Sequence, residues 1–582
     1  MASGERTAEN SGLRSDDVIS ALLKSYEEME MPIPRYLRVV LIPSAILFVA
    51  TVGLVIGFSF PIIISIPIVL LGFLILATAV LFPKIQHQNQ RTEIENRFHL
   101  LITHMTVLST TNINRMEVFR ELAEEPEYGA LSDEVGRIVT LVDVWNQSLD
   151  DACRRRARQV PSRILSDFLD RLAYSMGAGQ DLSDFLLREQ NVIINKYSTI
   201  YEGALDNLEV MKDLYLSMIL SMTFALVFAI VLPILTGTDP TIAVAAVIVM
   251  YIFVQTGFYL AIRSMTPYDP VWYNPNELET EVEKRLNVSL GIAVVLFFVL
   301  LGLLAGEEFS QLPLSLSDLN PFSDSIPFAL YIAIPLTPLV IPGILYRNEE
   351  SRIKGRDEEF PSFIRALGAS ESAKQTTTGR VLKSLRRKDF GSLSPAIDNL
   401  YKRLNMRIEN RKAWEHFSAE TRSYLIQKFA EMYLVGRRMG GDPKQLGELI
   451  SENMSQVIQL RERRNQATIT LVGLLYGITA ASTFAFFIGL AVIEILSGMT
   501  VNIEASEIGI NQLLHTNVYD LLELQYFLVL VILFNAILSS LMIRTVDGGH
   551  KANAYLHLVA LVWLGAIGAI VTQFVVSSFL VI

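Results

Sequence analysis

The stretch DFGSLSPAI (residues 389–397) has a near-twin, EYGALSDEV (127–135), far upstream in the chain. Both share an aromatic residue, glycine, a small residue, leucine and serine, in that order. A second motif follows each of them, YSMGAGQDLSDFL (174–186) upstream and GRRMGGDPKQLGEL (436–449) downstream. The aromatic residue of the first motif lies 48 positions before the methionine of the second motif in one copy and 49 in the other. We therefore infer an internal duplication with a period of about 260 residues.

The first motif is expected to form a turn followed by the start of a helix. Gly129 and Gly391 permit the turn because glycine has no Cβ. Ser132 and Ser394 are placed to cap the next helix, since a serine hydroxyl accepts a hydrogen bond from a backbone N–H of the first turn. Between the turns, apolar residues recur at helical spacing. Each copy is therefore predicted to be an antiparallel helical bundle.

The second motif is expected to end one helix and to begin another. Gly177 and Gly440 suit the left-handed residue that commonly follows a helix. Asp181 and Asp442 are then placed to cap the next helix, which continues toward an apolar segment. The sequence therefore predicts two long helices that pass without a break from an inner domain into the membrane.

The composition is that of a membrane protein with large polar parts. The 582 residues are 51% hydrophobic and 19% charged, and the mean hydropathy is +0.37. A helix needs about 20 mostly apolar residues to span a bilayer. Segments of this kind lie at 37–60, 61–82, 214–235, 241–263, 287–305, 326–346, 470–496, 523–543 and 555–580. The predicted fold class is all-α: a polytopic helical membrane protein of about nine transmembrane helices with two duplicated cytoplasmic helical-bundle domains.

The distribution of positive charge predicts the orientation. All 49 Lys and Arg residues lie on one side of the nine-span arrangement or at its membrane edge. Because cytoplasmic loops carry the excess of Lys and Arg, we expect the N-terminus inside and the C-terminus outside. Eight or ten spans with one re-entrant segment is the alternative. The predicted domains are a cytoplasmic N-terminal segment (1–36), a transmembrane hairpin (37–82), the first inner domain (83–213), a transmembrane pair (214–263), a cytoplasmic loop (264–286), a second hairpin (287–346), the second inner domain (347–469) and three final transmembrane helices (470–582).

The two inner domains differ in charge. The first has 15 basic and 21 acidic residues, a net charge of −6, and the second has 24 and 16, a net charge of +8. The second domain should therefore attract an acidic partner or anionic lipid. The candidate docking residues are the basic residues beside its two motifs: Arg386, Arg387, Lys388, Arg437 and Arg438. A third basic cluster, RERRNQ (461–466), is interpreted as a membrane anchor that sets the topology.

Sequence patterns for catalysis, cofactors and metals are absent. No GxxxxGK[ST], HExxH or GxSxG pattern occurs. We therefore expect no enzyme activity, no cofactor and no metal site. Nucleic acid is not expected as a partner, because the basic clusters lack interleaved aromatic residues. A membrane transporter is a more distant alternative, although charged residues are nearly absent from the predicted spans.

The repeated G-x-L-S turn and M-G-A/G break, each pair followed by membrane helices, resemble the type II secretion system F domain. The matching stretches are YGALS, SMGAG, FGSLS and RMGGD, within 98–235 and 360–496. That family contains the inner-membrane platform proteins of type II secretion systems, type IV pili and archaella. A hairpin before each domain resembles its archaeal branch, and KDFGSLSPAIDNLYKRLNMRIENRKAWEHF (388–417) resembles archaellum platforms.

The resemblance implies a non-catalytic function in the cell membrane, which the chain crosses many times. Such a platform engages a cytoplasmic hexameric ATPase through its inner domains and directs filament subunits, archaellins or pilins, from the bilayer into a filament. It also implies contacts with membrane lipids and a homo-oligomer. The archaellum is favoured, and the platform of an adhesive type IV pilus is the alternative. The five basic residues are then the candidate ATPase-docking residues, on charge and position alone.

Overall fold

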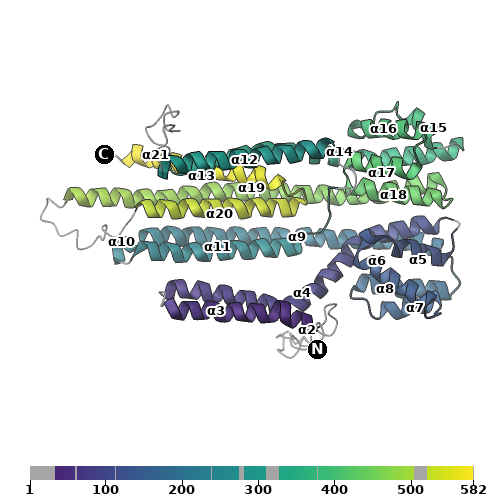
Figure 1. Ribbon diagram of the computed structural model, residues 1–582, viewed down its shortest axis with the longest axis horizontal. Helices are drawn as coiled ribbons and strands as arrows, with labels where there is room; N and C mark the ends of the chain where they lie inside the picture. Colours follow the sequence, from purple (N-terminus) through teal and green to yellow (C-terminus); the bar gives the residue numbers. More distant parts are fainter. Residues whose placement is uncertain are drawn as a thin grey trace, which may run out of the picture. The chain divides into compact units, whose positions relative to one another are not determined.

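The computed structural model describes residues 33–58, 62–111, 113–237, 239–273, 281–309, 327–375, 378–503 and 521–580. These residues are helical apart from turns, short connections and an isolated β-bridge, which confirms the predicted all-α membrane fold (Figure 1). The chain divides into two compact units. Unit 1 combines Met1–Phe98 with Phe119–Gln180, and unit 2 combines His99–Val118 with Asp181–Ile582.

The same order of helices occurs twice along the chain. The first series is α4 (Ile62–Ser109), α5 (Arg115–Ala123), η2 (Pro126–Tyr128), α6 (Ala130–Asp143), α7 (Leu149–Ala157), α8 (Arg163–Gly177) and α9 (Leu182–Val231). The second series is α14 (Val340–Lys374), α15 (Thr378–Leu385), η5 (Gly391–Leu393), α16 (Ser394–Asn405), α17 (Asn410–Thr421), α18 (Tyr424–Arg438) and α19 (Pro443–Ile503). Even the left-handed residue between the third and fourth α-helices recurs, at Asn146 (φ 48°) and Arg407 (φ 58°). The duplication is therefore a repeat of structure as well as of sequence.

α9 and α19 run from the inner domains into the apolar segments without a break. They contain 50 and 61 residues, or about 75 and 90 Å of helix at about 1.5 Å per residue. A continuous helix is the simplest way to enter lipid, because every backbone N–H and C=O is bonded within the segment. The two uninterrupted helices that the second motif predicts are therefore present.

Eight described helices are long and apolar enough to cross a membrane. They correspond to eight of the nine predicted segments, and the ninth, 61–82, lies in the first part of α4, where many side chains are outside the described set. The protein is a multi-pass membrane protein. The remaining elements are α2 (Ile33–Tyr36), η1 (Leu37–Leu41), α3 (Ile42–Phe58), α10 (Pro233–Thr236), α11 (Pro240–Met265), α12 (Glu281–Phe309), α13 (Leu330–Leu336), η4 (Thr337–Leu339), α20 (Leu521–Asp547) and α21 (Asn553–Leu580).

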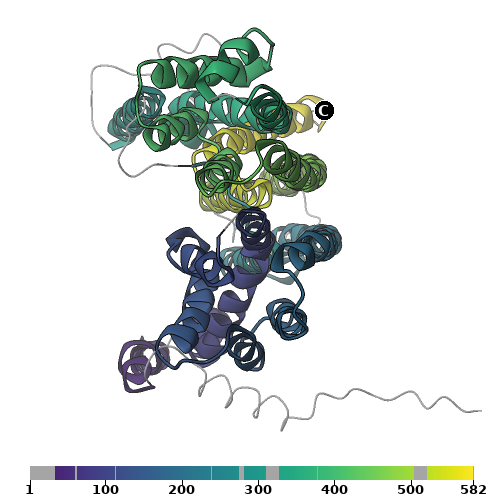
Figure 2. The ribbon, with the colours of Figure 1, turned by 90° about the vertical axis from the view of Figure 1, so that its right-hand side faces the viewer.

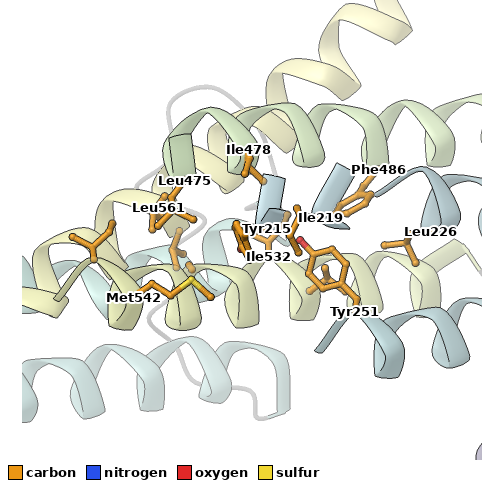
Figure 3. Packing of buried hydrophobic residues seen from close by; sticks show 14 of the residues in the cluster. Tyr215, Ile219, Leu226, Tyr251, Leu475, Ile478, Phe486, Ile532, Met542 and Leu561 are labelled. Atoms are coloured by element: carbon orange, nitrogen blue, oxygen red, sulfur yellow. The ribbon is translucent and has the colours of Figure 1, made fainter. Parts of the chain in front are cut away.

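The main apolar core of unit 2 lies between α9, α11, α19 and α20, with α21 packed alongside. Figure 3 shows side chains of this core, including Tyr215, Tyr251 and Phe486. A few polar side chains are buried among them. Gln255 Nε2 donates to Asn535 Oδ1 at 2.6 Å, and hydrogen bonds of this kind link helices where water is absent.

The aromatic residue of each first motif is a core residue of its inner domain. Phe390 is 1% exposed and its ring lies 5.6 Å from that of Phe363, edge to face. Tyr128, its counterpart in unit 1, is also 1% exposed. Figure 2 shows the second domain in green from a second direction, and its elements α15, η5, α18 and α19 contact α14. Burial of the aromatic ring therefore places the repeated turn at the same point of both bundles.

The second domain is held to its long helix by a close crossing of α14 and α19. Gly368 and Gly447 face each other across the crossing, with the Cα of Gly447 only 3.3 Å from the position that a Cβ on Gly368 would occupy. A Cβ on Gly447 would lie 2.8 Å from the carbonyl oxygen of Ile364. The two backbones are therefore closer than any larger side chain allows.

We predict that Gly447→Ala destabilises the protein. The added methyl group must displace the α14 backbone, and such overpacking costs about 1–3 kcal/mol, more than alanine gains in helix propensity. The measurement is thermal unfolding of the detergent-solubilised protein. Gly379→Ala is the matched control, because its Cβ would meet Leu404 at an ordinary 3.8 Å. Equal unfolding temperatures for the two variants would contradict the prediction.

Candidate functional site

The basic residues that follow α15 lie on an exposed turn of the second inner domain. α15 buries one apolar face and ends, and the chain then passes through Arg386, Arg387 and Lys388 before it reaches η5. Arg386 Nη1 lies 3.4 Å from the Asp398 carboxylate, and its guanidinium carbon lies 4.7 Å from the centre of the Tyr401 ring. All three basic side chains are exposed. The turn therefore presents cations that an acidic surface can reach.

Arg437 and Arg438 have different environments, although the sequence grouped them. Arg437 is half-buried, with Nε 3.1 Å from the Glu371 carboxylate and Nη1 donating to the carbonyl of Gly441 at 2.8 Å. The Tyr433 hydroxyl donates to the same carboxylate at 3.0 Å. The charge of Arg437 is therefore used inside the domain, to join α18 to α14. Arg438 is exposed on the last turn of α18.

The first motif forms its turn through glycine, but its serines do not cap as expected. Gly129 and Gly391 both have positive φ angles, 56° and 50°. Ser132 lies inside α6, and its hydroxyl donates to a carbonyl at the end of α5 at 2.8 Å. Ser394 is already the first residue of α16, and its hydroxyl accepts from the N–H of the motif's aromatic residue at 2.9 Å. Both serines therefore hold the turn together instead of capping the helix.

The second motif ends and starts helices, with one shift in position. Gly440 has a φ of 87° after α18, but the left-handed residue after α8 is Gly179 (φ 75°), because α8 continues through Gly177. Asp181 caps α9 by accepting from the N–H two residues on at 2.9 Å. Asp442 caps α19 by accepting from the N–H three residues on at 3.3 Å. Neither motif presents a reactive side chain in a cleft, so both are structural turns.

Arg461, assigned from the sequence to a membrane anchor, is instead the centre of a buried ion cluster. Its Nε and Nη2 donate to the two carboxylate oxygens of Asp269 at 2.8 and 2.6 Å. Its Nη1 donates to Asp357 at 2.8 Å, and the Ser423 hydroxyl donates to the other oxygen of Asp357. Burial alone would raise the pKa of Asp269, but the Arg461 charge outweighs burial and lowers it. Asp269 is therefore ionised and paired.

The other two arginines of the RERRNQ stretch (461–466) have different environments from Arg461 and from each other. Arg464 is buried and donates to the carbonyls of Val546 (2.5 Å) and Thr545 (3.2 Å) at the end of α20. Arg463 is exposed and pairs with Glu202 of α9. Helical periodicity in the sequence could have distinguished the arginines that face the protein interior from the one that faces solvent. Arg464 is buried and the Arg461 side chain is 12% exposed; three positions apart, they continue the apolar stripe of α19, whereas the Arg463 side chain is 59% exposed.

The segment after α11 ties the second inner domain to the membrane helices. Residues 266–273, named here the connecting segment, pair with 422–424: the N–H of Tyr273 donates to Arg422 O at 2.8 Å, and the N–H of Tyr424 donates to Val271 O at 3.1 Å. The connecting segment also carries Asp269 of the ion cluster. The domain is therefore attached to α11 as well as to its own two long helices.

A second polar cluster brings the loop before α21 to the same side. Glu350 of α14 accepts from Trp272 Nε1 (3.1 Å), from the N–H of His550 (3.1 Å) and from Asn553 Nδ2 (2.6 Å). These contacts place the loop that joins α20 to α21 beside the start of the second inner domain. That position agrees with the inner side that the charge distribution predicts for this loop.

The described residues contain no group of three or more His, Cys, Asp or Glu side chains that could hold a metal ion. His104 is buried near Lys428, and burial, aided by that charge, lowers its pKa to about 3. The imidazole is therefore neutral. The exposed cations at residues 386–388 lie on a turn that a binding partner can reach.

Comparison with known proteins gives relatives of nearly full length. Residues 101–231 match the family described as type II secretion system (T2SS), protein F. The chain is similar to flagella accessory protein J of Methanocaldococcus jannaschii, with 34% identity over 550 residues, 94% of this chain and 96% of the relative. Flagella accessory protein J of Methanococcus voltae is 32% identical over 542 residues, 92% of this chain and 94% of the relative. No solved structure matches the chain.

We predict that Arg461→Met is strongly destabilising. The change leaves two buried carboxylates without their cation, which costs about 3–5 kcal/mol. Thermal unfolding of the solubilised protein measures the effect. Arg463→Met is the control on the same helix, since that side chain is 59% exposed and such surface pairs contribute about 0–1 kcal/mol. Similar losses for both variants would show that the ion cluster is not what stabilises this region.

Proposed function

The chain belongs to the family of archaeal flagella accessory J proteins, and on that premise we propose that it is the membrane platform of an archaeal filament machine of the type IV pilus kind, an archaellum. The inner domains engage a cytoplasmic hexameric ATPase. The membrane helices receive filament subunits from the bilayer and direct them into the filament. In an archaellum the same coupling also transmits rotation. ATP hydrolysis belongs to the partner, and this chain performs no catalysis.

The observation that carries this proposal is the continuity of α9 and α19. Each helix begins at an aspartate cap in an inner domain and ends in an apolar segment, about 75 and 90 Å away along its axis. A displacement applied to an inner domain by an ATPase is therefore passed to the bilayer without an intervening flexible joint. A protein that only anchors a complex has no need of such helices.

The charge of the second domain supports an acidic docking partner. Its net charge is +8, and Arg386, Arg387 and Lys388 are exposed on one turn. Opposite charge on the partner speeds association and sets its orientation. Arg437 is a weaker candidate because it is bound to Glu371. We therefore assign ATPase docking to residues 386–388 together with Arg438.

The remaining partners follow from the membrane location. Exposed apolar side chains on α11 and α12, such as Phe253 and Phe298, contact lipid acyl chains. A platform beneath a helical filament also self-associates, so the proposal includes a homo-oligomer.

The proposed function predicts that an in-frame deletion of this gene abolishes surface filaments and swimming. Electron microscopy of the cells and a motility assay measure both, and the full-length gene restores them. Loss of adhesive pili with archaella retained would move the protein to the adhesive pilus machine. Retention of both kinds of filament would refute the platform function.

The docking assignment predicts that Arg386→Glu with Arg387→Glu lowers ATPase co-purification about tenfold or more, which corresponds to about 1.4 kcal/mol of binding free energy. Charge reversal replaces attraction by repulsion, and the exposed side chains leave the fold intact. Arg411→Glu with Lys412→Glu on α17 is the matched control, because it changes the net charge equally at another exposed place. Unchanged co-purification of the first variant, with normal membrane insertion, would disprove docking at this turn.

A further inference from the structure

A cavity opens where α9, α11, α19 and α20 enter the apolar region, at the ends that lie nearest the inner domains. Its volume is about 420 Å³, and α9 and α19 supply most of its lining. Glu202, Asp206 and Glu209 line it from α9, and Arg463 and Thr470 line it from α19. By the distribution of positive charge, this is the cytoplasmic edge of the membrane. The cavity therefore lies at the depth of lipid headgroups.

The α9 side of this cavity has the charge opposite to that expected at a cytoplasmic membrane edge. Residues 202–213 carry four acidic side chains and one lysine, whereas the equivalent residues of α19 counted from the aspartate caps, 463–474, carry two arginines and no acidic side chain. Cytoplasmic edges of membrane helices are usually rich in Lys and Arg, and anionic lipids repel carboxylates. The acidic edge of α9 is therefore unsuited to a lipid surface and suited to a cationic partner.

The acidic side chains are only partly neutralised within the chain. Glu202 pairs with Arg463, and Lys212 lies 3.4 Å from Glu209 and 3.9 Å from Asp213. Asp206 is exposed, and no basic group of the described residues lies within ion-pair distance of it. Asp206 is thus available to a cation from another molecule.

Next to the cavity, α19 presents a face of small residues that nothing in the described chain covers. Gln466, Thr470, Gly473 and Gly477 recur at helical spacing and are exposed. Apart from the neighbouring residues and backbone of α19 itself, no atom lies within 4 Å of the position of a Cβ on either glycine. Gly473 and Gly477 form the G-x-x-x-G pattern that lets two membrane helices approach closely. The face has the shape of a helix-binding surface without its helix.

The exposed side of α9 extends the same surface into the apolar region. Asp206, Asp213, Leu220 and Phe224 share one helical face, at spacings of seven, seven and four. Leu220 is 37% exposed and Phe224 is 64% exposed. α9 and α19 pack against each other, as Figure 1 shows. Together they offer carboxylates at the cytoplasmic edge and an apolar, small-residue surface within the bilayer.

We propose that this surface binds the transmembrane helix of a filament subunit, with the basic cytoplasmic end of that helix against Asp206 and Asp213. This inference rests on the proposed function. A single membrane helix with its N-terminal side inside carries Lys or Arg at its cytoplasmic end by the same charge rule. Its apolar part packs on Gly473 and Gly477, and its cations pair with Asp206, which has no ion-pair partner among the described residues, and share Asp213 with Lys212. The surface therefore receives the subunit before insertion into the filament.

A second copy of this chain fits the surface less well than a subunit helix. A two-fold contact across the face would bring the acidic edge of one α9 close to that of the other, which is unfavourable. A second copy is accordingly an outcome of the experiment that contradicts the proposal.

The test is photo-crosslinking in cells that assemble filaments. Phe224→p-benzoylphenylalanine places the crosslinker on the proposed surface, and Phe253→p-benzoylphenylalanine on α11 is the matched control, with an aromatic side chain that is 41% exposed. We expect a product that contains the filament subunit, identified by mass spectrometry, from Phe224 and at least tenfold less from Phe253. Equal yields, no subunit product or a product of two copies of this chain would overturn the inference.

Substitutions then test the two parts of the surface. Gly473→Leu with Gly477→Leu fills the small-residue face, and Asp206→Lys reverses the charge; each should lower the crosslink yield at least tenfold. Gly257→Leu on α11, another exposed glycine with no atom within 4 Å, and Glu452→Lys on α19 should leave the yield unchanged. Unchanged yields for the first set, or equal losses for the second, would refute the surface. The Phe224 crosslink is first measured in a chain without these substitutions. That result therefore does not depend on whether the substituted variants fold.

The deletion strain separates this inference from the proposed function. If filaments need this gene but Phe224 gives no subunit product, the surface is wrong and the platform function stands. If filaments form without the gene, the platform function itself fails.

Discussion

The arrangement of unit 2 depends on the pairing of Arg461 with Asp269 and Asp357. These side chains come from three different elements: α19, the connecting segment and α14. Removing charges from water is costly, and the attraction between them offsets that cost only while the geometry is kept. None of the three elements can move alone without leaving a buried charge unpaired. Within unit 2, this ion cluster therefore joins the second inner domain to the connecting segment after α11.

This constraint gives the long helices their use. α19 alone is a rod, and a rod attached at one place can pivot. The connecting segment adds a second attachment through its backbone pairing with 422–424, and Glu350 adds a third through the loop before α21. A force on the second domain is therefore distributed over α11, α19 and the α20–α21 loop.

Much of this fold could be predicted from the sequence, because its signals are local. An aspartate cap such as Asp181 and a left-handed glycine such as Gly440 depend only on a few neighbouring residues, so matched motifs revealed the duplication. Ser132 was misassigned because α6 begins at Ala130, three residues before the start that a cap at Ser132 predicts, and the local pattern of residue types fits both starts. The pairing of Arg461 with Asp269 could not be found, because 192 positions separate them and only the folded packing brings them together. The candidate docking residues lie between these two cases. Their charges are evident in the sequence, but only the structure shows that Arg437 is already paired with Glu371.

Duplication also explains how one chain can present an acidic and a basic helix side by side. Orientation in the membrane is set by the total of Lys and Arg in the inner segments, and the second domain alone supplies 24 of the 49. The edge of α9 is thereby released from the need to carry positive charge. Since α9 and α19 occupy equivalent places in the two copies and pack together, a change of sign in one copy creates a polarised site between two otherwise similar helices. In a protein with only one inner domain, the Lys and Arg residues of that domain alone would have to set the orientation in the membrane. An acidic edge would then be harder to accommodate.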